Sequence, residues 1–451
     1  MNVATIILAA GMGSRMKSDM PKVLHPIAGA PMLVHTMRAA ASIAAQKTVI
    51  ITGHGADLVA SLAKEYDGTA VIAHQETQNG TGHAVQQAAA VLQDFDGDVI
   101  VLYGDTPFVQ PKTLQAMLDK RSEGHGVVVL GFHATVPAKY GRLITTDHGL
   151  LEAIVEYKDA TDIQRDINFC NSGVICADAK LLFSLLAEVT NDNASGEYYL
   201  TDIVGLARTR GLTCAAIACD EAETMGINSR IDLAAAEVTF QAKARYDAME
   251  NGATLIAAET VWFAYDTIIG RDVVIEPNVV FGPDVTIENN ANIRAFSHLE
   301  GCHVSKDAVV GPYARLRPGA ELANGARVGN FVEIKAAQIG EGAKVNHLSY
   351  IGDADVGDSA NIGAGTITCN YDGVFKHKTK IGQRAFIGSN TMLVAPVHIG
   401  DDAMTASGSV ITQDVPDAAL GVGRARQQTK PGLALRMMNK LHAAKAAMKK
   451  G

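Results

Sequence analysis

A six-residue period runs through the second half of the chain and limits its fold more than any other feature of the sequence. From Ile269 onward an aliphatic or Phe residue recurs at every sixth position, with occasional steps of five, and is often followed by Gly, Asp or Asn. This hexapeptide repeat predicts a left-handed parallel β-helix, in which each inward residue stacks on its equivalents above and below. An antiparallel β domain would show a period of two instead. The repeat positions are Ile269, Ile275, Phe281, Ile287, Ile293, Leu299, Val304, Val310, Leu316, Leu322, Val328, Ile334, Ile339, Val345, Ile351, Val356, Ile362, Ile381, Ile387, Leu393 and Ile399, with weaker matches at Thr405 and Ile411.

The period is broken between Ile362 and Lys380, where the sequence reads GAGTITCNYDGVFKHKTK. We expect a loop to leave the coil in this segment. Loops on a rigid scaffold often carry binding and catalytic residues.

The first half of the chain shows a different organisation. From Val3 to about Ile217, apolar strand-like runs alternate with helical stretches such as PMLVHTMRAAASIAA and HAVQQAAAVLQDF. That alternation predicts βαβ units around a mostly parallel sheet, with ligands beyond the carboxyl ends of the strands. Apolar residues near helical spacing over 229–249 predict a connecting helix that stops at Asn251-Gly252. We therefore expect three regions, at 1–228, 229–250 and 251–451.

Composition argues against several classes of function. The 451 residues carry a net charge of -9, so no overall basic field exists to hold a nucleic acid backbone. The start MNVATIILAAGMG has no basic segment, and glycines break its apolar run, unlike a secretion signal or a membrane span. We expect a soluble cytoplasmic protein with no membrane partner. The six cysteines have no CxxC spacing and are expected to be small buried residues.

The C-terminal tail is basic. No acidic residue follows Asp417, whereas eight Lys and Arg residues do. Such a tail suits a phosphate-rich cofactor, but basic termini are also commonly just solvated, and the sequence favours neither interpretation.

A glycine-rich segment, LAAGMGSRM over 8–16, directly follows the first predicted strand. Gly11 and Gly13 allow the backbone to turn closely around a ligand and to present amide groups to phosphate. The segment lacks the GKS or GKT of a P-loop, and Met16 stands where a dinucleotide fingerprint has its third glycine. With Arg15 and Lys22 nearby it suits a triphosphate, whose charge grows on the leaving pyrophosphate. The alternative is a surface turn with solvated charges.

Asp105 ends the apolar run VIVLYGD, at the carboxyl end of a predicted strand. An acidic residue there is suited to Mg²⁺, which prefers one or two carboxylates together with substrate phosphates. The same residue is also a common helix cap or turn residue.

Motifs along the whole chain closely resemble those of the GlmU family of bifunctional bacterial enzymes. In the first half they read LAAGMGSRM, PKVLH, QNGTGHA, LYGD, YGRL, VEYKDA, CNSG, GEYYLTD and GIN. In the second half they read RLRPGA, VGNFVEIK, HLSYIGDA, NIGAGTITCNYDG and FIGSN. The resemblance implies a Rossmann-like α/β nucleotidyltransferase domain followed by a β-helix acetyltransferase domain.

The resemblance also implies the reactions. Glucosamine-1-phosphate is acetylated with acetyl-CoA, and UMP then passes from UTP to N-acetylglucosamine-1-phosphate with release of pyrophosphate. The product, UDP-N-acetylglucosamine, is a precursor of peptidoglycan and lipopolysaccharide. Mg²⁺ is the implied metal, acetyl-CoA and UTP are the implied co-substrates, and the implied assembly is a homotrimer whose acetyltransferase sites draw on more than one chain.

For the nucleotidyltransferase site, the resemblance implies that Asp105 and Asn228 bind Mg²⁺ while Arg15 and Lys22 stabilise the phosphates. Ser14 stands where the family's loop would have Thr, and because the hydroxyl is kept we expect little change. The implied uridine contacts are Leu8, Ala9, Ala10, Gly11, Gln75, Gly80 and Thr81, and the implied sugar contacts are Tyr103, Gly104, Gly141, Glu156 and Asn171.

For the acetyltransferase site, the resemblance makes His347 the general base that takes a proton from the attacking amine. Periodicity alone does not select it over His298, His303 or His398. Ser407 stands where Ala is expected, a silent change if the contact is made by the backbone and a change in cofactor affinity if it is not. The implied sugar-phosphate contacts are Arg317, Lys335, Tyr350 and Asn361, and the implied acetyl-CoA contacts are Ala364, Asn370, Tyr371, Ser389, Ser407 and Arg424.

Three other interpretations can be set against this one. A single-function nucleotidyltransferase with a trimerising β-helix is opposed by the long repeat tract and by His347, Asn370 and Tyr371 together. A binding protein with decayed sites is expected to lack Asp105, Lys22 or His347, and all three are present. A zinc enzyme has enough imidazoles in the repeat region but no recognisable ligand spacing. Those imidazoles belong to His298, His303, His347, His377 and His398.

Overall fold

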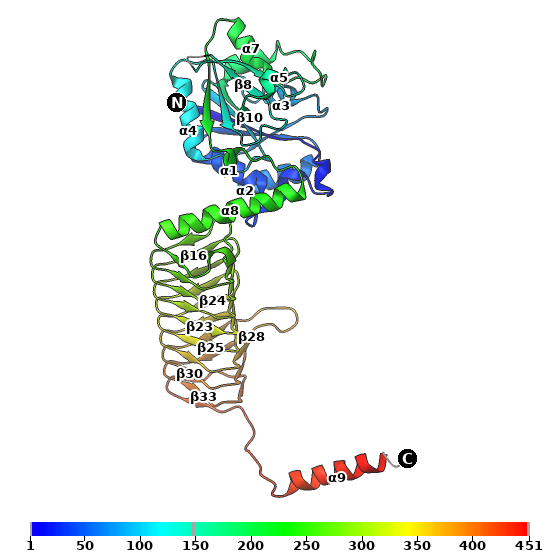
Figure 1. The fold of residues 1–451 in the computed structure, drawn as a ribbon. Coiled ribbons are helices and arrows are strands. Elements are labelled where there is room, and N and C mark those ends of the chain that lie inside the picture. The colour runs from blue at the N-terminus through cyan, green and yellow to red at the C-terminus, as the bar shows by residue number, and fades with distance from the viewer. Residues whose placement is uncertain (1, 147–148, 449–451) are drawn as a thin grey trace. The chain divides into compact units, whose positions relative to one another are not determined.

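The computed structural model describes residues 2–146 and 149–448, which form two compact units. The first unit runs to Asp247 and takes in Trp262–Thr267, and the second contains Ala248–Val261 and continues from Ile268. Figure 1 shows the sheet and helices of the first unit and the stacked coils of the second.

A mostly parallel sheet forms the core of the first unit, as the alternation of strands and helices predicts. Along the order β11-β7-β10-β6-β1-β4-β5, β10 is antiparallel to β6 and β7, and the other neighbours are parallel. A hairpin of β8 and β9 joins β10 through β8. The strands are β1 Val3–Ala9, β4 Lys47–Thr52, β5 Val71–His74, β6 Asp98–Tyr103, β7 Val127–His133, β8 Arg142–Thr145, β9 Leu151–Val155, β10 Phe169–Asp178 and β11 Cys214–Cys219.

Helices cover both faces of this sheet, which explains why its strands read as nearly continuous apolar runs. One buried cluster joins alternate strand residues to α1, α2 and α4, and a second joins the other strand residues to α3, α6 and α7. The helices are α1 Met32–Ser42, α2 Ala56–Tyr66, α3 Thr81–Gln86, α4 Pro111–Ser122, α6 Ala179–Leu186 and α7 Asp202–Thr209.

The helix expected over HAVQQAAAVLQDF is shorter than predicted. After α3 ends at Gln86 the chain continues as successive turns. Most amides there bond to the carbonyl three residues earlier, as Ala89 does to Gln86 at 3.0 Å, although Leu92 still reaches Ala88 four residues back. The alanine-rich sequence therefore forms tighter turns than an α-helix would.

The predicted connecting helix is α8, Arg230–Glu250. Its start is fixed by a reciprocal cap, because Asp232 N donates to Ser229 Oγ at 3.2 Å and Ser229 N donates to Asp232 Oδ2 at 2.9 Å. The same carboxylate accepts from Asn228 N at 3.0 Å. The cap thus fixes the backbone of Asn228, a predicted magnesium ligand.

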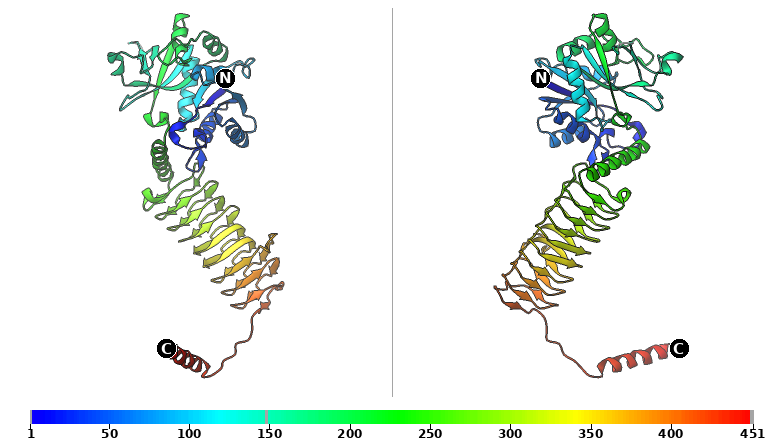
Figure 2. Two further views of the ribbon diagram at one scale, coloured as in Figure 1. Left: turned by 90° about the vertical axis from the view of Figure 1, so that its right-hand side faces the viewer. Right: turned by 60° about the vertical axis from the view of Figure 1, so that its left-hand side comes forward.

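The second unit is a parallel β-helix with three faces of short strands, and Figure 2 shows its stacked coils in two further views. Two longer strands, β24 Glu333–Ile339 and β26 Tyr350–Val356, turn the edge from the second face to the third. The first face holds β12 Thr254–Leu255, β14 Val274–Ile275, β17 Asn292–Ile293, β20 Val309–Val310, β23 Arg327–Asn330, β25 Lys344–His347, β27 Asn361–Ile362, β30 Phe386–Ile387, β33 Met404–Thr405 and β35 Leu420–Gly421. The second holds β15 Val280–Phe281, β18 His298–Leu299, β21 Arg315–Leu316, β28 Ile367–Cys369, β31 Met392–Val394 and β34 Val410–Ile411, and the third holds β13 Ile268–Ile269, β16 Val285–Ile287, β19 Cys302–Val304, β22 Ala320–Leu322, β29 Thr379–Ile381 and β32 Val397–Ile399.

The repeat positions point inward as predicted, and every one except the half-buried Ile269 is buried. The expected break is narrower than the sequence indicates. Six residues after Ile362, Thr368 takes an inward position and is fully buried, with its hydroxyl donating to Gly352 O at 3.0 Å. The loop therefore leaves the coil only after β28 and returns at Thr379 (Figure 1). A polar inward residue hid this turn from a search for aliphatic side chains.

The basic tail ends in α9, Leu433–Met448, whose described side chains are mostly exposed. No helix within the described part of the chain is both long and apolar enough to cross a membrane.

Candidate functional sites

A cavity of about 270 Å³ lies in the first unit beyond the carboxyl ends of β1 and β6. The position agrees with the expectation for a parallel sheet. Ten residues predicted from the sequence line it, namely Leu8, Ala9, Ala10, Gly11, Lys22, Gln75, Gly80, Thr81, Tyr103 and Asp105. Four lining residues were not predicted, namely Val23, Gln78, Ala84 and Glu197.

Backbone geometry explains the glycines around this cavity. Gly13 has φ 61°, and a Cβ there would lie 2.6 Å from Lys22 Cβ. Gly80 has φ 108°, and a Cβ there would lie 2.7 Å from Tyr198 O. Both positions therefore exclude a side chain on grounds of space and of backbone conformation. Gln78, which the sequence did not single out, fastens the glycine-rich turn by donating from Nε2 to Ala10 O at 2.6 Å.

The glycine-rich turn carries Arg15 and is hydrogen-bonded to Arg230, the first residue of α8. Arg15 lies exposed on the short 3-10 helix Ser14–Met16. Arg230 donates from Nε to Met16 O at 3.3 Å, and its Nη1 lies 3.2 Å from Nδ1 of the buried His25. One guanidinium thus joins the turn, the segment after Lys22 and the start of α8.

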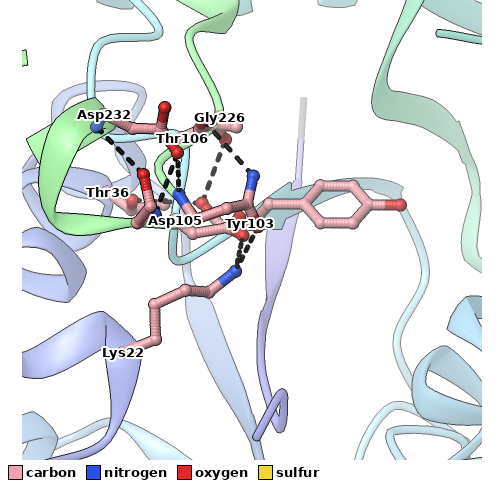
Figure 3. A network of polar contacts seen from close by, with 9 residues as sticks. Lys22, Thr36, Tyr103, Asp105, Thr106, Gly226 and Asp232 are labelled. Carbon is pink, nitrogen blue, oxygen red and sulfur yellow. Dashed lines mark hydrogen bonds and ion pairs between the residues drawn. The ribbon is translucent and has the colours of Figure 1, made fainter. Parts of the chain in front are cut away.

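Lys22, Asp105 and Asn228 converge at one point, and Figure 3 shows Lys22 beside Asp105. The Lys22 ammonium pairs with the Asp105 carboxylate and donates to Asn228 Oδ1 at 3.0 Å. A backbone bond of 3.0 Å from Ile227 N to Asp105 O keeps the two segments together, although they lie far apart in the sequence. The structure therefore brings together both predicted magnesium ligands and one predicted phosphate contact.

The donor set at this point fits a magnesium ion. A carboxylate and an amide oxygen both face the Lys22 ammonium, so they already solvate a cation at their common point. Mg²⁺ takes such hard oxygen ligands and completes its shell with substrate phosphates and water. Across residues 2–146 and 149–448, no group of three or more His, Cys, Asp or Glu side chains could hold a metal without such help.

The predicted sugar contacts lie around Tyr103, whose pKa is raised by burial and by the carboxylates of Asp105 and Glu156. Asn171 N donates to Gly141 O at 2.8 Å, and a Cβ on Gly141 would lie 3.4 Å from Glu156 Oε2. Burial raises the pKa of Glu156, whose Oε1 accepts from Thr201 at 3.2 Å. A half-buried carboxylate, whose two oxygens can accept several hydrogen bonds, suits sugar hydroxyl groups. The remaining predicted residue, Gly104, donates its amide to Leu8 O at 2.9 Å.

Two buried histidines predict how the first unit responds to acid. Burial lowers the pKa of His25 and of His35, and Arg230 lowers that of His25 further. The folded unit therefore binds fewer protons than the unfolded chain just below the unfolded histidine pKa of about 6.5. Their contribution to stability is present above that pH and is lost as the pH falls toward the folded pKa values.

We expect the thermal midpoint of the first unit to fall between about pH 7 and pH 5. In a His35→Gln chain this fall should be shallower, whereas the exposed His54→Gln should leave it unchanged. Scanning calorimetry across that range measures the slope. An identical slope in His35→Gln would show that His35 is not held neutral by the fold.

In the β-helix, the predicted base and four predicted acetyl-CoA contacts follow one edge. His347 lies opposite Asn330 in the register of β23 and β25, and its Nδ1 is 2.8 Å from Asn330 Oδ1. In the coils that follow, the same edge carries Ala364, Ser389 and Ser407, whose neighbours are joined by backbone bonds such as Gly408 N to Ser389 O at 2.8 Å. The edge ends near Arg424, because a Cβ on Gly408 would lie 3.8 Å from Arg424 Cδ.

Two of the predicted sugar-phosphate contacts, Arg317 and Lys335, lie at another edge, where β24 and β26 turn. Lys335 lies within β24, and its pKa is lowered mainly by contact with Lys376 and also by Arg317. Three cations thus lie close together, although Glu333 binds Arg317 at 2.8 Å. Lys376 belongs to the protruding loop and was missed in the sequence, where nothing relates it to Lys335.

The other predicted residues are spread around the coil. Asn370 Nδ2 lies 3.4 Å from the Tyr350 hydroxyl and also contacts Asp353, so Asn370 and Tyr350 lie at the same edge as Lys335. Tyr371 is exposed on the loop. Asn361 points outward from the first face. One chain therefore places the predicted base and the predicted phosphate contacts on different edges of the β-helix.

The zinc alternative can now be compared with the observed histidines. His303 lies between Glu288 and Glu321, at 3.0 and 3.4 Å, and His377 pairs with Asp372 at 2.7 Å. Within the described residues, neither histidine belongs to a group of three or more His, Cys, Asp or Glu side chains that could hold a metal.

Comparisons with known proteins agree with both halves. The family of MobA-like NTP transferase domains matches residues 5–170, and the bacterial transferase hexapeptide family matches 266–301 and 378–413. Proteins named Bifunctional protein GlmU match along the full chain. The relative from Jannaschia sp. (strain CCS1) is 62% identical and covers 99% of this chain and 98% of its own. Those from Ruegeria sp. (strain TM1040) and Roseobacter denitrificans are 62% and 61% identical, with 100% of both chains covered.

With an N-terminal nucleotidyltransferase fold, a C-terminal hexapeptide β-helix and relatives of this identity over its full length, the chain belongs to the bifunctional GlmU family.

Proposed function

We propose that the first unit transfers UMP from UTP to N-acetylglucosamine-1-phosphate and that the β-helix supplies this acceptor by acetylating glucosamine-1-phosphate with acetyl-CoA. The observation that carries the first activity is the convergence of Lys22, Asp105 and Asn228 beside a glycine-rich turn. The observation that carries the second activity is the contact between His347 and Asn330. It lies at the start of the β-helix edge that continues through Ala364, Ser389 and Ser407. The chain is thus a bifunctional enzyme of UDP-N-acetylglucosamine synthesis.

In uridylyl transfer, a phosphate oxygen of the sugar phosphate attacks the α-phosphorus of UTP, and the bond to the β-phosphate oxygen breaks. A phosphate dianion needs no general base, so positioning and charge neutralisation provide most of the rate. Arg15 and Lys22 neutralise the leaving pyrophosphate. Asp105 and Asn228 would hold Mg²⁺, which when bound screens the phosphate charges.

Gln75 is the residue that we hold responsible for uracil. It is 4% exposed, and its amide nitrogen lies 3.2 Å from Gly80 O and 3.0 Å from His83 Nδ1. With the nitrogen engaged in this way, Oε1 is left to accept the N3–H of uracil. Cytosine has an acceptor at that ring position and would leave the buried amide oxygen unpaired.

In acetyl transfer, the sugar amine attacks the thioester carbonyl, its proton passes to His347, and coenzyme A leaves as the thiol. The contact with Asn330 Oδ1 assigns the Nδ1 proton of His347, so Nε2 is the basic nitrogen. Asn330 is a positioning residue that the sequence did not reveal. Arg317, Lys335 and Lys376 would bind the sugar phosphate, whose charge relieves the repulsion between the two ammonium groups.

A homotrimer explains why the predicted acetyltransferase residues lie on separate edges of one chain. Beside His347, an exposed apolar column follows the edge between the first and second faces. Its rings stack with centroids 4.9 and 5.2 Å apart. An exposed aromatic column of this kind is suited to burial against another protein surface. The column consists of Phe296, Tyr313, Phe331 and Leu348, which are 47 to 61% exposed, and we call these four residues the ladder.

Placing a charge in the ladder should separate the two activities. In a Phe331→Asp chain we expect the trimer to dissociate and acetyl transfer to fall at least about 10²-fold, because one copy would then lack part of its site. Uridylyl transfer should stay near the wild-type rate. Light scattering and both assays test this, with Ile268→Asp, at an exposed position on the third face, as the control. A trimer that survives Phe331→Asp would contradict the proposed interface.

One coupled assay tests the two-step function. The full chain is given glucosamine-1-phosphate, acetyl-CoA, UTP and Mg²⁺, and free thiol and pyrophosphate are followed separately. We expect both to be released, with pyrophosphate depending on acetyl-CoA. Pyrophosphate without acetyl-CoA would mean that the first site accepts the unacetylated sugar, and absence of thiol would favour the single-function alternative.

A further inference from the structure

A second cavity of about 580 Å³ lies within the first unit, and none of the described residues that line it also lines the nucleotide cavity. This volume is within the usual range of small-molecule sites. Its walls come from α1, from the segment that follows Asp105, from the segment after β11, and from α8 with the nearby Tyr265. Neither of the two proposed reactions uses this second cavity.

Aromatic rings dominate one side of the cavity. His35 packs edge-on against Phe240 and against Tyr265, with ring centroids 5.9 Å apart in each pair. Burial lowers the pKa of His35, which keeps its ring neutral. Phe108, Phe240 and Tyr265 are only partly buried, so their rings can stack with a flat ligand ring.

Cations and acceptors are placed around these rings. The Arg38 guanidinium lies 4.8 Å from the Tyr265 ring centroid and donates from Nη1 to Tyr265 O at 3.0 Å; within residues 2–146 and 149–448 its other N–H groups remain for an anion. In the described part of the chain, the Lys243 ammonium pairs with the half-exposed Asp247 at 2.8 Å, a pair that costs little to exchange. Asp220 also lines the cavity and can accept from hydroxyl groups.

We propose that this cavity binds a nucleoside phosphate. The base would stack on the rings of Phe108, Phe240 and Tyr265, the phosphate would meet Arg38 and Lys243, and ribose hydroxyls would donate to Asp220. These residues combine flat apolar surface, cations and an acceptor, which are the three features that such a ligand requires.

The walls of the cavity also lead to the proposed magnesium ligands. The pair Pro107 and Phe108 is separated from Asp105 by one residue, and Glu223 precedes Asn228 by a few residues. Glu223 ties these walls together, because its Oε2 accepts from Gln110 N at 3.0 Å and from Thr113 Oγ1 at 2.7 Å. A ligand that orders these walls lowers the conformational entropy cost of binding Mg²⁺, so the two sites should bind cooperatively.

Ligand-observed NMR on the full chain tests the site with AMP, GMP, CMP and UMP as probes. Arg38→Ala removes a cation, Ser42→Trp fills the cavity from an exposed position, and Gln75→Ala disables the first nucleotide site. We expect saturation transfer to at least one probe that survives Gln75→Ala and weakens about 10-fold or more in Arg38→Ala and Ser42→Trp. The exposed Arg210→Ala, which removes contacts with Ser184 and Glu188, is the matched control.

Two results would overturn the inference, namely no signal from any probe in the Gln75→Ala chain, or a signal that both cavity variants leave intact. Cooperativity predicts that saturating Mg²⁺ tightens probe binding about 5-fold, and that this effect disappears in Asp105→Asn. Equal affinity with and without Mg²⁺ would refute the coupling. The inference rests on the proposed function only for that coupling. If the wild-type chain bound a probe but showed no uridylyl transfer, the proposed function would be overturned and the proposed nucleoside-phosphate site would not.

Discussion

A His347→Ala chain is expected to lose acetyl transfer by about 10²–10⁴-fold while keeping uridylyl transfer on supplied N-acetylglucosamine-1-phosphate. Without the imidazole, the ammonium of glucosamine must lose its proton to water before it can attack the thioester. The uridylyl site draws on residues of the first unit alone, so it should be unaffected. Thiol release and pyrophosphate release, measured separately on the same preparation, test both parts.

The matched control is His303→Ala, which removes a partly exposed imidazole from the same β-helix. His303 interacts with Glu288 and Glu321 and lies on the third face, so both activities should stay near the wild-type rates. Asn330→Ala should lower acetyl transfer less than His347→Ala does. It should also shift the pH profile of acetyl transfer, because the proton of the neutral His347 ring is then no longer held on Nδ1 by Asn330. Equal loss of both activities in a folded His347→Ala trimer would contradict the assignment of two independent sites.

The β-helix is the part of the fold that the sequence predicts best. Its inward side chains repeat at a fixed spacing, and burial follows that spacing from Ile275 to Ile411. The predicted loop is present but is shorter than the break in the period, because Thr368 continues the period with a buried hydroxyl satisfied by Gly352. Period searches rest on apolar side chains, so a hydrogen-bonded inward residue escapes them.

The first site was predictable where its residues follow strands. Tyr103 ends β6, Asp105 follows it, and Leu8 lies near the end of the neighbouring β1; the carboxyl ends of such parallel strands meet at one edge of a sheet. Glu197 lines the same cavity but does not follow a strand, so the strand pattern does not predict it. It comes from the loop before α7, whose course depends on tertiary contacts such as Tyr198 N to Asn79 O at 2.9 Å.

Residues that act through register were out of reach of sequence patterns. Asn330 meets His347 because one turn of the coil separates them in β23 and β25. Lys376 meets Lys335 because the loop folds back on the edge of the β-helix, fastened by a bridge to Tyr371. In both cases the distance along the chain gives no local signal, and only the closed coil brings the side chains together.

An Asp105→Asn chain should show the reciprocal result, with uridylyl transfer lowered at least about 10²-fold and acetyl transfer unchanged. The substitution keeps the shape of the side chain but removes the charge that pairs with Lys22 and that would hold Mg²⁺. Raising the Mg²⁺ concentration should restore the rate only in part, because a neutral amide is a weaker ligand for this ion. Initial rates of pyrophosphate release across a Mg²⁺ titration measure the effect.

Asp98→Asn is the matched control, since it neutralises a carboxylate at the other end of the same strand, β6. Asp98 pairs with Arg121 at 3.2 Å, and burial raises its pKa, so the fold should tolerate a neutral side chain there. Both activities of that chain are expected to stay near the wild-type rates. If Asp105→Asn instead kept its uridylyl rate at low Mg²⁺, the convergence of Lys22, Asp105 and Asn228 would have to be structural, and the phosphates would depend on the cations of Arg15 and Lys22 alone. The two substitutions together therefore separate a charge required by the reaction from one that is required only by the strand.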